Sequence, residues 1–127
     1  MIRRATMGDI AAINKWCGAD FGEFIVNKLN VVLIEGEGCA MFAWRGPGIY
    51  EAHSNLAQRG KAAFDTAHRM FSHMRENHEV SLFWTAVPIG SRKVIMFARR
   101  LGWKSRGVTQ FPHGACEIFA KDNSCHI

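Results

Sequence analysis

The sequence lacks long hydrophobic runs and paired cysteine motifs. No apolar stretch approaches the roughly 20 residues that a membrane-spanning helix needs. Met1–Arg4 leads into polar sequence rather than into the apolar core of a signal peptide. The four cysteines form no CxxC pair and lie mostly within apolar stretches, as reduced core thiols do. We therefore expect a cytoplasmic protein that does not interact with a membrane.

Metal-ligand patterns, internal repeats and low-complexity tracts are absent as well. Four residues near the end of the chain could be drawn as one ligand cluster: His113, Cys116, Cys125 and His126. Their spacing matches no standard zinc site. The sequence therefore predicts no metal.

Length and composition indicate one folded domain. A chain of 127 residues can bury one hydrophobic core but is short for two. Apolar residues make up 48% of it, enough to offset the entropy of ordering the chain. Its 16 basic and 11 acidic residues give a net charge of +5, which favours an anionic partner. Because the basic residues are dispersed, a nucleic-acid interface ranks below a phosphorylated cofactor.

Hydrophobic periodicity divides the chain into strands and helices. The predicted strands are Ile2–Arg4, Val31–Ile34, Cys39–Trp44, Ile49–Leu56, Val80–Ala86, Ser105–Phe111 and Ala115–Ala120. The predicted helices run from Thr6 to Trp16, from Phe21 to Leu29, from Gly60 to Met74 and from Ser91 to Leu101. Thr6 and Ser91 are predicted N-caps. This order indicates an α/β (α+β) fold, with a mixed sheet of about six or seven strands flanked by about four helices.

The start of the long predicted helix is a candidate anion site. Gly60 opens this helix, and Ala62 and Ala63 keep its first turn small. The first amides of a helix lack internal partners and the helix dipole is positive there, so a phosphate can bind them. Arg59 and Lys61 add positive charge beside that site. A solvated helix that simply begins at glycine would show the same pattern.

Two polar residues on the predicted strand Ile49–Leu56 are candidate bases. Glu51 and His53 lie two positions apart and therefore share one face of the strand. A histidine has an ordinary pKa near 6.5, which suits a general base, whereas Glu51 would need its pKa raised by burial. A half-exposed polar strand face accounts for both residues equally well.

Short motifs occur in order along these elements. The first is Ile2-Arg3-Arg4-Ala5-Thr6 followed by Asp9-Ile10, the second is Arg59-Gly60, and the third is Leu101-Gly102-Trp103. With the order of elements, they resemble the GNAT superfamily of N-acetyltransferases, especially its compact phage-encoded members, over nearly the whole chain. The resemblance implies one acetyltransferase domain over residues 1–127. It also implies acetyl-CoA as cosubstrate and an amine of a small molecule or protein as acceptor.

The coenzyme A loop of that family has the form Q/R-x-x-G-x-G/A, and two registers fit this chain imperfectly. One places Gly60 and Ala62 at the small positions and Ala57 where Gln or Arg is expected. The other aligns Arg59-Gly60-Lys61 with a common Arg-Gly-Lys but puts Ala62 and Phe64 at glycine positions. We favour the first because Phe64 belongs to the apolar stripe of the helix. The resemblance assigns cofactor binding to Asn55 and Leu56, through backbone amides, and to Arg59, Gly60, Lys61, Ala62, Ala63 and Ser91.

The chain departs from the family at the general acid. Members often carry Asn at the start of the fourth helix and, seven residues later, a Tyr that protonates the departing sulfur. This chain has Ser91 and Ala98 there, and its only tyrosine, Tyr50, lies on a predicted strand. The sequence therefore predicts an N-acetyltransferase without that acid. The alternative is a catalytically degenerate phage structural or interaction protein. A homodimer or a phage or host protein partner stays open, and a phage-encoded protein would lie in the host cytoplasm.

Overall fold

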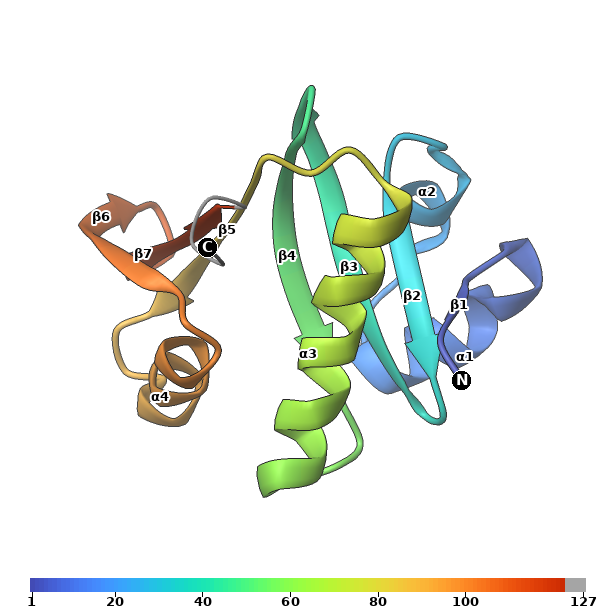
Figure 1. Cartoon of the computed structure of the whole chain (residues 1–127), viewed down its shortest axis with the longest axis horizontal. Helices are drawn as coiled ribbons and strands as arrows, with labels where there is room; N and C mark the ends of the chain where they lie inside the picture. Colours follow the sequence, from blue (N-terminus) through green and yellow to red (C-terminus); the bar gives the residue numbers. More distant parts are fainter. Residues whose placement is uncertain (123–127) are drawn as a thin grey trace.

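The computed structural model describes residues 1–122, which form one seven-stranded sheet with helices on both faces (Figure 1). The strands are β1 (Arg3–Arg4), β2 (Val31–Glu35), β3 (Gly38–Gly46), β4 (Ile49–Asn55), β5 (Leu82–Pro88), β6 (Lys104–Phe111) and β7 (Gly114–Asp122). The helices are α1 (Ile10–Cys17), α2 (Gly22–Val26), α3 (Gly60–Asn77) and α4 (Arg92–Arg100), with a 3₁₀ turn, η1 (Met7–Asp9), before α1. The predicted number and order of the main elements are confirmed.

The sheet is mixed, with the strand order β1-β2-β3-β4-β5-β7-β6. All neighbouring pairs are antiparallel except β4 and β5, which run parallel and are connected through α3. A parallel pair needs such a crossover, because the chain must return to the same end of the sheet before the second strand begins. No helix in residues 1–122 is both long and apolar enough to cross a membrane.

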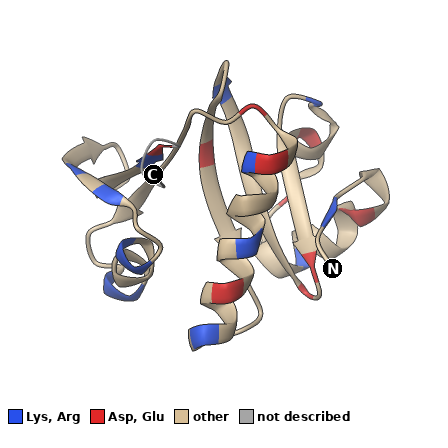
Figure 2. Cartoon of the chain, in the orientation of Figure 1, with Lys and Arg blue, Asp and Glu red and all other residues tan. Residues whose placement is uncertain are grey.

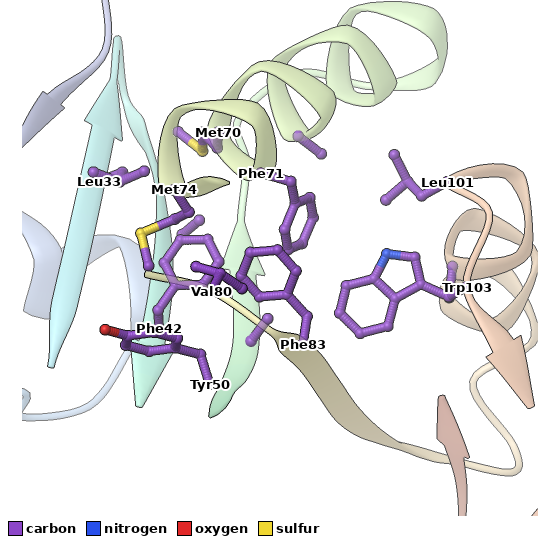
Figure 3. Packing of buried hydrophobic residues seen from close by; sticks show 14 of the residues in the cluster. Leu33, Phe42, Tyr50, Met70, Phe71, Met74, Val80, Phe83, Leu101 and Trp103 are labelled. Atoms are coloured by element: carbon purple, nitrogen blue, oxygen red, sulfur yellow. The ribbon is translucent and has the colours of Figure 1, made fainter. Parts of the chain in front are cut away.

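Each face of the sheet has its own core. On one face α3 packs on the sheet, with Phe42, Phe71 and Phe83 fully or almost fully buried and their ring centroids 5.0–5.6 Å apart (Figure 3). On the other face α1 and α2 cover a smaller cluster around the buried Ile13 and Met41. Burying apolar area at about 25 cal/mol per Å² makes these two layers the main stabilising contribution.

The second helix is shorter than predicted. It ends at Val26, and Leu29 lies outside it with about half of its surface exposed. The Asn27 side chain accepts a hydrogen bond from the Leu29 N–H at 3.0 Å, and the Asn30 N–H donates to the Asn27 carbonyl at 3.0 Å. Such local asparagine turns compete with helical hydrogen bonding and end the helix early.

Candidate active site

The sheet opens between β4 and β5. Their parallel pairing covers Ile49 to Glu51 of β4, opposite Leu82 to Trp84 of β5. Beyond this point β4 continues to Asn55 beside β3, and β5 continues to Pro88 beside β7. The two strands diverge (Figure 1). Within residues 1–122, their facing backbone N–H and C=O groups therefore have no ladder partner on that side and are available to a ligand.

A cleft of about 250 Å³ lies at this divergence. It is bounded by β4, β5, the middle of α3, and α4 with the turn that follows it. Its lining residues are Ala52, His53, Ser54, Phe71, Thr85, Ala86, Val87, Pro88, Ser91, Val94, Phe97, Ala98, Leu101 and Trp103. Mostly apolar walls with a few polar groups are typical of small-molecule sites.

His53 lies in a hydrogen-bonded chain with Glu51 and Arg45. Its Nε2 lies 2.6 Å from Glu51 Oε2, and the Arg45 guanidinium donates to Glu51 Oε1 at 2.8 and 3.0 Å. Burial raises the pKa of the Glu51 carboxyl, but the hydrogen bonds and charges of His53 and Arg45 outweigh burial and leave that pKa below its ordinary value. Glu51 is therefore ionised at neutral pH, and the raised pKa that a Glu51 base requires is not found.

An ionised carboxylate can only accept hydrogen bonds, so the tautomer of a neutral His53 follows from this contact. Nε2 carries the proton and donates to Glu51, which leaves the Nδ1 lone pair to accept a proton. About half of the His53 side chain is exposed, and the residue lines the cleft. Of the two predicted bases, only His53 lines the cleft.

The start of α3 has the predicted open geometry. Gly60 has a positive φ of +61°, and no heavy atom lies within 4 Å of a Cβ built there. Arg59 is the extended N-cap residue, Ala62 is exposed and Ala63 is buried. Lys61 forms an exposed ion pair with Asp65 at 3.0 Å. Basic residues occur at this end of α3 and along α4, the two helices that bound the cleft (Figure 2).

Other predicted site residues have different surroundings. Ser91 is the N-cap residue of α4, as predicted, and lines the cleft, but its hydroxyl makes no capping hydrogen bond within the described residues. The Asn55 amide donates to the Trp16 carbonyl of α1 at 2.9 Å, so its side chain ties the end of β4 to α1. Leu56 packs against the larger core. Asn55 and Leu56 can thus contribute to the site only through their backbone.

The large aromatic side chains lie mostly in the core. Phe83 and Phe119 are fully buried, whereas Trp44 and Trp84 are half-buried. Trp103 is 6% exposed and also lines the cleft. Sequence reasoning missed this second feature because a buried aromatic and a cleft wall have the same hydrophobic pattern.

Within residues 1–122, no three His, Cys, Asp or Glu side chains come together as a potential metal site. His113 Nε2 lies 3.8 Å from Cys116 Sγ. The other two members of the weak cluster, Cys125 and His126, lie outside the described residues.

In sequence, no family model and no curated protein matches this chain. In structure, it is similar to a variant of the spermidine N-acetyltransferase SpeG from Vibrio cholerae, with a TM-score of 0.84 at 10% identity over 100% of this chain and 97% of that chain. It is also similar to the aminoglycoside acetyltransferase AAC(6')-Ib in complex with ribostamycin and coenzyme A, with a TM-score of 0.76 at 14% identity over 99% and 94% of the two chains. The chain therefore has the fold of the GNAT N-acetyltransferases, as the sequence resemblance implied.

Proposed function

We propose that this protein is an acetyl-CoA-dependent N-acetyltransferase. The observation that carries the proposal is the cleft at the divergence of β4 and β5, which has His53 on its wall. The fold supports the proposal, since structures of AAC(6')-Ib contain coenzyme A or acetyl-CoA. Fold alone does not fix an activity, so the site has to account for the chemistry.

The residues present fit an acyl-coenzyme A. The cleft accepts a narrow arm, and the exposed backbone groups of β4 and β5 can pair with amides of that arm. Gly60, Ala62 and Ala63 leave the first turn of α3 accessible to a pyrophosphate, with Arg59 and Lys61 beside it. Ser91 lines the cleft with its hydroxyl free of a capping bond.

The structure supports the first of the two loop registers. Phe64 packs against the larger core and makes an edge-to-face contact with Phe97 of α4, with ring centroids 6.4 Å apart. A glycine at that position would remove a contact between the two helices that bound the cleft. Gly60 and Ala62 are therefore the small residues that we place next to the phosphates.

His53 accepts a proton from the amine, directly or through a water, as the amine nitrogen attacks the thioester carbonyl. The new C–N bond forms, the C–S bond breaks, and the acetyl group ends on the amine. Glu51 holds His53 in the required tautomer and stabilises the imidazolium that forms. Backbone amides near Asn55 and Leu56 are candidate donors to the developing oxyanion.

The proton for the departing thiolate comes from water in this proposal. Ala98 lines the cleft at the position where the family resemblance implies Tyr, and a methyl group has no proton to donate. Tyr50 is buried in the α3-side core and is not among the lining residues. We therefore expect slower turnover than in an enzyme that has the phenol.

Calorimetric titration with acetyl-CoA tests the cofactor site. Gly60→Glu places a carboxylate where the pyrophosphate would bind, and Gly36→Glu is a matched control. Gly36 has the same backbone strain, with φ +62° and no atom within 4 Å of a built Cβ, but it lies in the β2–β3 turn. We expect the wild type and Gly36→Glu to bind and Gly60→Glu to lose at least tenfold in affinity, about 1.4 kcal/mol. No binding by folded wild-type protein would refute the proposal.

A panel of amines identifies the acceptor class. The panel contains spermidine, kanamycin and a lysine peptide, and mass spectrometry detects a gain of one acetyl group. The missing phenol at Ala98 favours a second function, a protein of this fold that binds partners without turnover. Acetyl-CoA binding without acetylation of any amine would favour that second function.

A further inference from the structure

Trp103 carries a hydrogen-bond donor for which the described part of the chain provides no acceptor. The residue is 6% exposed, and its indole Nε1 is sealed from solvent with no partner within hydrogen-bond distance. A buried donor left without an acceptor destabilises a protein by about 1–3 kcal/mol. A phenylalanine would bury a similar ring without that cost, so the indole nitrogen requires an explanation.

The nitrogen faces the wall of the cleft. Figure 3 shows the Nε1 edge of the indole directed toward the space between Phe71 and Leu101, and all three residues line the cleft. The other side of the indole packs in the core, where its centroid lies 5.2 Å from the Phe71 ring and 6.4 Å from the Phe83 ring. Packing therefore fixes the ring and determines the direction of the donor.

The backbone places this donor beside Ala98, the position where the family resemblance implies a Tyr. The Trp103 N–H donates to the Ala98 carbonyl at 3.1 Å, so the chain after α4 folds back onto the helix and brings Trp103 next to Ala98. Ala98 is small, and both residues line the same cleft. Beside Ala98, the unpaired indole N–H provides a donor at the cleft wall.

We propose that Trp103 donates a hydrogen bond through Nε1–H to an acceptor atom on the acyl-pantetheine arm, an amide or thioester oxygen or the sulfur. This inference rests on the proposed function. Because Nε1 is sealed, the acceptor reaches it only when Phe71 or Leu101 shifts, and the proposal includes that adjustment. The indole N–H donates a hydrogen bond that binds and positions the arm, and it transfers no proton because an indole N–H is too weak an acid.

The test replaces the N–H without changing the shape of the side chain. Site-specific incorporation of 3-benzothienylalanine at position 103 keeps two fused rings and puts sulfur in place of N–H, and Trp103→Phe is a second, genetically encoded variant. Trp84→Phe is the matched control, because Trp84 is a half-buried tryptophan of β5 that does not line the cleft. Each protein is titrated with acetyl-CoA, coenzyme A and adenosine 3',5'-bisphosphate, which lacks the arm.

We expect both position-103 variants to bind acetyl-CoA between about twofold and tenfold more weakly, the range for one hydrogen bond. Affinity for adenosine 3',5'-bisphosphate should stay unchanged, and the ligand-free melting temperature of the benzothienyl variant should not fall. An equal loss of affinity for coenzyme A would place the acceptor in the part of the arm that both ligands share. A loss of affinity confined to acetyl-CoA would assign the acceptor to the thioester oxygen.

Unchanged acetyl-CoA affinity in both variants would overturn the role of Trp103 and leave the proposed function intact. An equal loss for adenosine 3',5'-bisphosphate would also overturn that role, because it would indicate a distorted fold. A wild-type protein that binds neither acetyl-CoA nor coenzyme A would overturn the proposed function, and the inference about Trp103 with it.

Discussion

The two ends of β4 have different neighbours. From Ile49 to Glu51 the strand is hydrogen-bonded on both edges, to β3 and β5, and its buried Tyr50 faces the core. From Ala52 to Asn55, β3 is its only partner in the described part of the chain, and His53 and Ser54 border the cleft. One strand thus contributes stability at its first half and a candidate reaction site at its second. Mutations at the two ends should therefore affect different measurements.

The largest expected effect is on turnover, at the open end of β4, where Ala52 to Asn55 have no pairing with β5. His53→Ala removes the proposed base, and we expect kcat to fall about 10²–10⁴-fold, the usual contribution of general base catalysis. The affinity for acetyl-CoA should change little. The assay follows acetylation of the best acceptor from the amine panel by mass spectrometry.

His113→Ala is the control for this prediction, since His113 is an exposed histidine in the β6–β7 turn. If His53→Ala keeps the wild-type kcat, the amine proton passes to water without help from a protein base. Glu51 and His53 would then have no role in catalysis.

The next effect is on stability at the paired end. Phe83 is fully buried, lies opposite Tyr50 in the ladder and packs against Phe42 and Phe71. Phe83→Ala should lower the free energy of unfolding by about 3–5 kcal/mol, the range for removing a buried aromatic ring. Urea denaturation measures the loss.

Ser54→Ala sharpens the comparison, because Ser54 is an exposed residue of β4 itself, beyond the part of the strand that pairs with β5. We expect the free energy of unfolding to change by less than about 0.5 kcal/mol, as for most surface substitutions. Similar losses for Phe83→Ala and Ser54→Ala would contradict the division of β4 into two functionally different halves.

The fold was largely predictable because burial leaves a periodic pattern in the sequence. Val31–Ile34 is a continuous apolar run since both faces of β2 are covered, and the face of α3 that contains Met70 and Met74 repeats at helical spacing. The early end of α2 was missed, because the local hydrogen bonds of Asn27 and Asn30 have no hydrophobic signature.

The site was only partly predictable. Alternation along β4 placed Glu51 and His53 together, and they are in contact. The third member of the chain, Arg45, lies across a hairpin with an irregular register after Trp44, which no period reveals. The divergence of β4 from β5 was invisible for a similar reason. Whether a strand edge is paired depends on the position of another strand and not on the strand's own residues.

The smallest expected effect concerns Glu51, at the boundary between the two halves. Its folded-state pKa lies below the ordinary value because of His53 and Arg45, so its ionised form stabilises the folded state. This contribution is full above the unfolded pKa, near 4.3, and is lost as the pH falls through the folded-state pKa. Glu51→Gln should therefore lower the free energy of unfolding by about 0.5–1 kcal/mol at pH 7, because the partners are half-exposed. Urea denaturation of both proteins should show this gap narrowing as the pH falls below the unfolded pKa, and a gap that does not narrow would assign the effect to packing at the edge of the cleft rather than to charge.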